Sequence, residues 1–124
     1  MVIKIAAKVS PQLRELETVK RAGWKYIEIY TSKEFLKEEY LQYLLRFKND
    51  FSYVVHAPTH HWDKEVIDFT NKIGDKIIVI HSYKNLEDNL QELLDYAESQ
   101  GISICLENGY EQHRKPITIE DFEY

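Results

Sequence analysis

Cysteine, glycine and proline are all scarce in this chain, and it contains no long apolar run. Among its 124 residues Cys105 is the single cysteine, so the chain has no internal disulfide framework and a cytoplasmic location is expected. No apolar stretch approaches the roughly 20 residues that a membrane helix needs. The 4 glycines and 3 prolines form no linker or low-complexity segment. These absences favour one domain over residues 1–124.

Basic residues are outnumbered by acidic ones, and this bears on the possible partners. The chain has 16 Lys and Arg against 21 Asp and Glu, a formal net charge of −5 at pH 7. Surfaces that bind nucleic acid normally carry a basic excess. The charge balance therefore favours a small polar molecule over nucleic acid, and nothing indicates a membrane partner.

Short runs of β-branched residues alternate with longer amphipathic runs. The strand candidates, each rich in Ile, Val or Tyr, are residues 2–9, 25–30, 51–57, 76–82 and 102–107. Four helical patterns lie between them, and this alternation predicts parallel strands with right-handed crossovers. Both an open doubly wound sheet and a β/α barrel fit the pattern. No GxGxxG or P-loop motif follows a strand, so the doubly wound nucleotide-binding alternative loses its main support.

Residues that favour helix ends lie at the boundaries of the helical patterns. The expected N-caps are Ser10 (followed by Pro11), Ser32, Asp63 and Asn85, and the expected stops are Gly23, Gly74 and Gly101. Near the end of the chain, Thr118 and Asp121 predict the start of a further helix. We therefore expect about five parallel strands and four helices of a TIM (β/α)8-type barrel, truncated in the next helix.

Four successive strand candidates carry a metal-binding or proton-transferring side chain at or near their C-terminal ends. These side chains are Glu28, His56, His81 and Glu107. This end of the strands is the rim at which β/α barrels place their chemistry. Two imidazoles and a carboxylate suit Zn, with Mn or Mg as alternatives. The pattern predicts His56, His81 and Glu107 as metal ligands, and Glu107 and Glu28 as catalytic carboxylates.

Other candidate residues lie in the predicted rim loops or on the strands below them. His60, Trp62 and Tyr83 are candidate substrate-binding residues, although exposed histidines or aromatic residues packed under a loop would also explain them. Glu28 would equally be explained by an ion pair with a lysine of the first strand candidate. Cys105, one pleat below Glu107, is expected to be a buried, inert thiol.

Three segments resemble the third, fourth and fifth strands of the xylose-isomerase-like barrel superfamily: VVHAP (54–58), IVIHS (78–82) and ISICLEN (102–108). This superfamily includes sugar and sugar-phosphate isomerases and epimerases, and apurinic endonucleases of the endonuclease IV type. For the endonuclease IV branch, the resemblance implies that His56 and His81 bind one zinc ion and that Glu107 bridges it to a second. In the isomerase branch it implies Glu107 as a metal ligand and acid/base partner. Ser82 departs from the His-Pro-Gly pattern of many relatives, and ligands from later strands have no counterpart here.

Three functional hypotheses follow from these observations. The first is a metal-dependent isomerase or epimerase acting on a sugar or sugar phosphate, with the ion polarising substrate oxygens and Glu107 moving a proton. The second is a zinc phosphodiesterase acting at abasic DNA, which the lack of a basic stripe disfavours. The third is an inactive or split half-barrel, which would form a homo-oligomer or pair with a complementary barrel half because open strand edges invite pairing.

Overall fold

The computed structural model describes residues 4–59, 63–81 and 89–107, in which strands and helices alternate. In chain order the elements are β1 (Ala7–Val9), α1 (Leu13–Arg21), β2 (Tyr26–Tyr30), the 3-10 helix η1 (Lys33–Phe35), α2 (Glu38–Arg46), β3 (Ser52–His56), α3 (Lys64–Ile73), β4 (Ile77–Ile80), α4 (Leu90–Ser99) and β5 (Ser103–Leu106). All five strand candidates are confirmed, with narrower bounds. The expected cap Asn85 and the expected last helix lie outside the described residues. Within these ranges, no helix combines the length and apolar character needed to cross a membrane.

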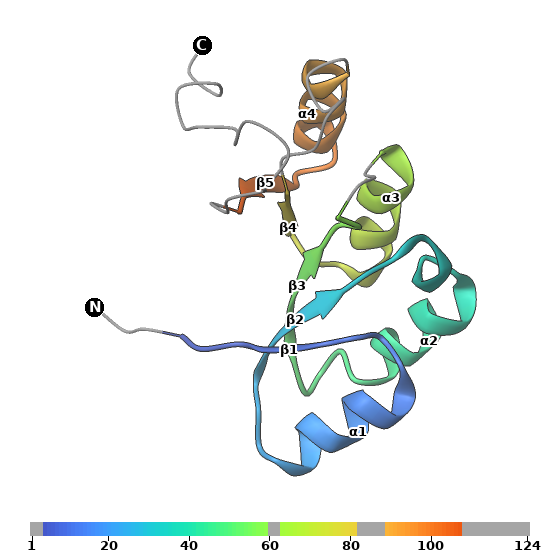
Figure 1. The fold of residues 1–124 in the computed structure, drawn as a ribbon, viewed down its shortest axis with the longest axis vertical. Helices are drawn as coiled ribbons and strands as arrows, with labels where there is room; N and C mark the ends of the chain where they lie inside the picture. Colours follow the sequence, from blue (N-terminus) through green and yellow to red (C-terminus); the bar gives the residue numbers. More distant parts are fainter. Residues whose placement is uncertain (1–3, 60–62, 82–88, 108–124) are drawn as a thin grey trace.

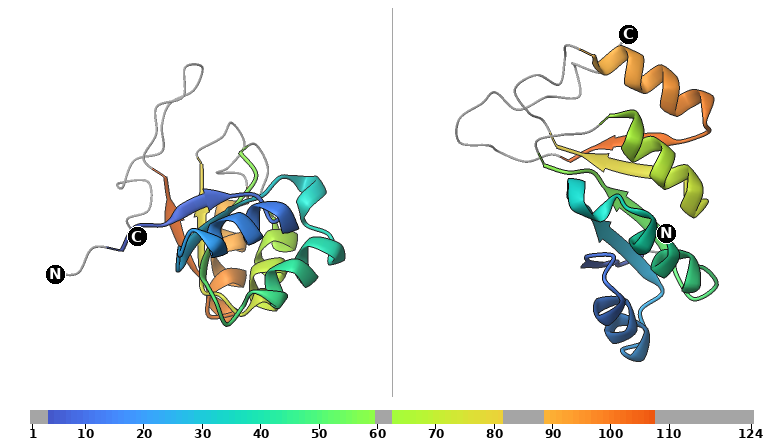
Figure 2. Two further views of the ribbon diagram at one scale, coloured as in Figure 1. Left: turned by 90° about the horizontal axis from the view of Figure 1, so that it is seen from below. Right: turned by 90° about the vertical axis from the view of Figure 1, so that its right-hand side faces the viewer.

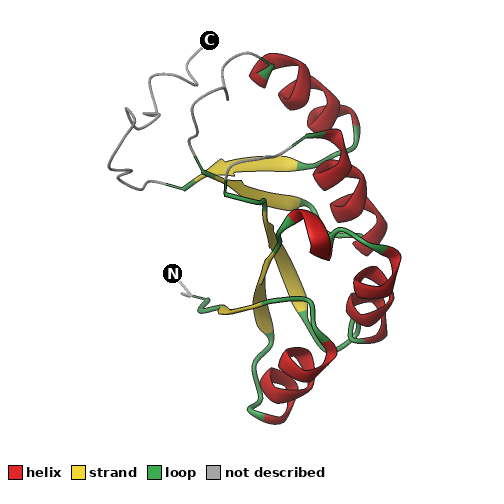
Figure 3. Cartoon of the chain, turned by 45° about the vertical axis from the view of Figure 1, so that its right-hand side comes forward, coloured by secondary structure: helices red, strands yellow, loops and turns green. Residues whose placement is uncertain are grey.

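The five strands form one parallel sheet in which the spatial order follows the chain, β1-β2-β3-β4-β5. The helices cover one face of this sheet and form an arc along it (Figures 1 and 3), and Figure 2 shows the same arrangement from two further directions. A doubly wound sheet would reverse its strand order and carry helices on both faces. Of the two predicted architectures, the partial β/α barrel is therefore the one that the chain adopts.

The hydrophobic core lies between the sheet and the helices. Side chains of a strand alternate between its two faces, and the apolar set points toward the helices as predicted. The fully buried strand residues are Ile27, Ile29, Val55, Ile78 and Ile80, and those of the helices include Leu16, Leu44, Ile67 and Ile73. Burying each such side chain contributes about 1.5–3 kcal/mol. This packing fixes which strand residues must face away from the helices.

The sheet face opposite the helices, called here the open face, carries the more polar set of strand residues. Tyr30 and Ile77 on this face are each 39% exposed, and Cys105 is exposed as well. The expectation of a buried thiol at Cys105 is therefore wrong. The reason is that the helices cover only the other face, whereas Cys105 shares the open face with Glu107.

The helix ends confirm some of the expected caps and contradict others. Asp63 caps α3 by accepting a hydrogen bond from the backbone N–H of Glu65 at 2.9 Å. By contrast, α1 begins after Gln12, and the Ser10 hydroxyl donates to the side chain of Glu15 instead of capping the helix. Ser32 precedes η1, whereas α2 begins after Lys37. Residues 11–12 intervene between Ser10 and α1, and the 3-10 helix η1 with two further residues intervenes between Ser32 and α2.

We expect Gly74→Ala to lower the free energy of unfolding by about 1–2 kcal/mol, the usual cost of a left-handed backbone for a residue with a Cβ. Gly74 ends α3 at φ +88°, and a Cβ there would meet the end of the Lys48 side chain, 2.6 Å from Nζ. Because that side chain can move, the backbone should dominate the cost. Urea unfolding measures it, with Gly74→Asn as control, since Asn tolerates this conformation better. Equal losses in both variants would argue against a backbone origin.

Candidate metal centre

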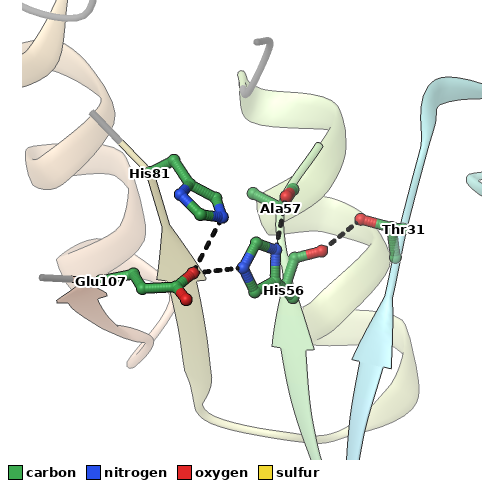
Figure 4. Close-up of polar contacts among 5 residues, drawn as sticks. All are labelled: Thr31, His56, Ala57, His81 and Glu107. Carbon is green, nitrogen blue, oxygen red and sulfur yellow. Dashed lines mark hydrogen bonds and ion pairs between the residues drawn. The ribbon is translucent and has the colours of Figure 1, made fainter. Parts of the chain in front are cut away.

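Three neighbouring strands deliver His56, His81 and Glu107 to one edge of the sheet. His56 is the last residue of β3, and His81 and Glu107 directly follow β4 and β5. Nε2 of His56 lies 2.7 Å from Oε2 of Glu107, and Nε2 of His81 lies 2.8 Å from the same oxygen (Figure 4). Possible ligand atoms of the three residues all lie within 4.8 Å of one another. The predicted ligands therefore come together, while their binding of a metal stays a prediction.

His56 is held in a single orientation by its neighbours. Its side chain is 1% exposed, and its Nδ1 lies 2.8 Å from the carbonyl oxygen of Ala57, to which it donates. Its own carbonyl oxygen accepts hydrogen bonds from the Thr31 hydroxyl at 2.6 Å and the Thr31 backbone N–H at 3.1 Å. Metal-binding histidines usually donate their second ring N–H to a carbonyl or carboxylate in this way. His56 thus presents Nε2 to the site.

The contact between His56 and Glu107 calls for a positive charge between them. Because Nδ1 of His56 donates to Ala57, a neutral ring carries a lone pair on Nε2. This lone pair would face the lone pairs of Glu107 Oε2 across 2.7 Å. Two acceptors at this separation repel each other unless a proton lies between them, and a metal ion bound by both atoms would replace that proton with the atoms slightly further apart. The donor set of two imidazoles and one carboxylate therefore fits a divalent cation.

Glu107 is the negative group of the site, and its surroundings favour the ionised form. Partial burial raises the pKa of Glu107, but its hydrogen bond with His56 and the charges of His81, His56 and Lys8 together lower it below the ordinary value. The side chains of Glu107 and His81 are 40% and 22% exposed. The site is therefore an ionised carboxylate beside two imidazoles at an edge that solvent can reach.

The lowered pKa of Glu107 predicts how the metal-free chain responds to acid. Because the folded-state pKa lies below the ordinary 4.5, the contacts of Glu107 stabilise the fold above that pH and this contribution is lost as pH falls through the folded-state pKa. In chelator, Glu107→Gln should therefore unfold at lower urea concentration than the unmodified chain at pH 7. The difference should shrink below pH 4.5. A difference that stays constant into acid would contradict this account.

The remaining predicted residues stand apart from these three. Glu28 on β2 is half-buried and pairs in register with Val54, two residues before His56. On the open face it therefore lies one pleat deeper than His56, that is, two residues nearer the N-terminal ends of the strands. It is not part of the cluster of metal-capable side chains found among the described residues. The candidates His60, Trp62 and Tyr83 lie outside the described residues.

Two residues that contribute to the site were not assigned a role from the sequence. Thr31 is buried and holds the backbone of His56. Its position immediately after a strand was the only available signal. Lys8 on β1 acts electrostatically on Glu107. Strand alternation places Lys8 on the same face as Glu107, but it does not give the height of Lys8 relative to the site.

The fold and the three converging side chains define a β/α protein of the partial-barrel type with a candidate His-His-Glu metal centre. Comparison with known protein families, curated proteins and solved structures finds no match for this chain. Its resemblance to the xylose-isomerase-like superfamily remains a prediction from three short segments.

Proposed function

We propose that His56, His81 and Glu107 bind one divalent cation, and that this centre serves an isomerase or epimerase acting on a sugar or sugar phosphate. The observation that supports the metal most strongly is that possible ligand atoms of these three residues all lie within 4.8 Å of one another. The orientation of His56 by Ala57 adds to it. The function rests on this site and on the family resemblance. A cytoplasmic location remains part of the proposal.

The donor set favours zinc over Mg and Mn. Imidazole nitrogens suit Zn, whereas Mg and Mn are better suited by oxygen ligands. Three protein ligands with a remaining open position are typical of catalytic zinc sites. His56, His81 and Glu107 would supply those three ligands.

The chain's own residues suit proton transfer next to a carbonyl group. A bound divalent ion would supply Lewis acidity toward the oxygens of an open-chain sugar. His56, buried and held by Ala57 and Thr31, would keep its place during the reaction. Glu107 is ionised and partly exposed, so it is able to take a proton from the substrate and return it. Glu28, one pleat deeper, is the second candidate for this role.

A zinc phosphodiesterase acting at abasic DNA is the second candidate function. The two imidazoles favour it, because they favour zinc, and zinc centres also promote hydrolysis. The net charge of −5 counts against a nucleic-acid partner.

Assembly with a second copy or with a complementary half-barrel is the third proposal. Among the described residues, β1 and β5 each pair with a strand on one side only, and the open face is partly exposed. Unpaired edges of this kind invite strand addition.

A parallel assay separates these candidates. The purified chain, loaded with Zn, Mn or Mg, is incubated with aldoses, ketoses and their phosphates, and separately with a duplex that contains an abasic site. We expect metal-dependent aldose–ketose exchange that chelator abolishes. Cleavage of the duplex alone would select the second candidate. Failure to bind any divalent ion would overturn both, and sedimentation velocity shows whether the chain assembles.

A further inference from the structure

The three predicted metal ligands, His56, His81 and Glu107, do not all lie opposite one another in the register of the sheet. In register His56 is level with Val79, whereas its partner in the site, His81, lies two residues further along the chain. Barrels impose such a stagger, because their strands tilt relative to the barrel axis. In β/α barrels the inward side chains consequently form layers contributed by alternate strands. In this chain β1, β3 and β5 are such a set.

Lys8 occupies the position on β1 that the same stagger predicts. It pairs in register with Glu28, and Glu28 pairs with Val54, which lies two residues before His56. Measured by this register, His56 lies two residues nearer the N-terminal ends of the strands than Glu107 does. Lys8 in turn lies two residues nearer the N-terminal ends of the strands than His56 does. The register therefore assigns Lys8, His56 and Glu107 to one layer.

Two further observations agree with this placement. Lys8 lies on the same face as Glu107, and its positive charge acts on the Glu107 carboxylate. Lys8 is exposed, and it forms no hydrogen bond or ion pair with another described residue. As far as the described residues are concerned, its donors are therefore available to a ligand that approaches the open face.

The charges at this face favour an anionic ligand. Glu107 and Glu28 together balance a divalent ion, and the imidazoles are neutral when they bind metal. Lys8 then remains as an excess positive charge on the same face of the sheet. Phosphate oxygens are good acceptors for both an ammonium group and a divalent cation.

We propose that Lys8 is a substrate-binding residue that donates to a phosphate oxygen, so that the centre takes small phosphate monoesters in preference to neutral sugars. This inference rests on the proposed metal centre and narrows its substrate class. A phosphate monoester carries up to two negative charges, whereas a diester such as a nucleic-acid backbone carries one per phosphate. The monoester therefore gains more from Lys8.

The test measures anion binding to the cobalt-loaded chain by the change in the visible spectrum of cobalt. Inorganic phosphate, methyl phosphate and dimethyl phosphate are titrated into the unmodified chain, Lys8→Met and Lys4→Met. Lys4→Met is the matched control, because it removes the same charge nearby in sequence. The ammonium group of Lys4 lies 5.1 Å from the Tyr26 ring centroid. We expect Lys8→Met to weaken binding of phosphate and methyl phosphate about tenfold, the loss of one charge-assisted hydrogen bond, and to leave cobalt affinity within about threefold. Lys4→Met should change neither by more than about twofold.

The outcomes separate this inference from the proposed function. If cobalt binds but phosphate affinity is the same in Lys8→Met and the unmodified chain, the role of Lys8 is wrong and the metal centre stands. Equal losses in Lys8→Met and Lys4→Met would show a general charge effect and also contradict it. Tighter binding of dimethyl phosphate than of methyl phosphate would overturn the preference for monoesters. If cobalt does not bind, the metal centre is wrong and this inference fails with it.

Discussion

Replacing His56 with alanine is expected to lower the affinity of the chain for zinc at least about 100-fold. Loss of a group that merely orients a ligand typically costs 10–100-fold in metal affinity, and here a ligand itself is removed. Competition with a chromophoric chelator measures the change. Because the His56 side chain is 1% exposed, its removal also leaves a cavity. Circular dichroism must therefore show that the variant is folded.

Two other variants keep this prediction testable even if His56→Ala folds poorly. The His81 side chain is 22% exposed, so His81→Ala should fold normally and still lose zinc affinity to a similar extent. His113→Ala removes an imidazole to which the sequence assigns no role, and it should bind zinc like the unmodified chain. Unchanged zinc affinity in folded His81→Ala would count against a site formed by these residues.

Glu107→Gln is expected to slow metal-dependent isomerisation by about 10²- to 10⁴-fold, the usual contribution of a general acid or base. The amide cannot take up the substrate proton, but it keeps the size and shape of the side chain. The rate is measured per bound metal ion, so that weaker metal binding is not mistaken for slower chemistry.

Glu28→Gln is the matched control for this change, because it removes a carboxylate from the same face one pleat deeper. We expect its effect on the rate to be smaller. If Glu28→Gln lost more activity per bound ion than Glu107→Gln, the two carboxylates would exchange roles. An unchanged rate in Glu107→Gln would remove it from the chemistry altogether.

The strands and their inward residues were predictable because they depend on local patterns. Runs of Ile, Val and Tyr mark the strands, and alternation then assigns each residue to a face. His56, His81 and Glu107 come at the ends of successive parallel strands, which must meet at one edge of the sheet. Their convergence follows from these two facts. The helix starts near Ser10 and Ser32 were harder to predict, because a short intervening segment, such as the 3-10 helix η1, shifts a helix boundary without changing its apolar pattern.

The rest of the site depends on relations between strands that no local pattern contains. The level of Lys8 relative to Glu107 is set by the stagger of the sheet, which accumulates over five strands. The hold of Thr31 on His56 likewise depends on the register of β2 and β3. The exposure of Cys105 depends on what covers the open face. Residue type and alternation give the face of a strand residue, but not these distances.

The most direct test of the metal centre is X-ray absorption at the zinc edge of the chain loaded with one equivalent of zinc. Zinc held by His56, His81 and Glu107 predicts scattering from two imidazoles at about 2.0–2.1 Å with oxygen in the remaining shell. Because the chain has 5 histidines, the same spectrum is recorded on the His56→Ala/His81→Ala double variant, in which the imidazole signal should be absent. An imidazole signal that persists in the double variant, or is missing from the unmodified chain, would contradict the site.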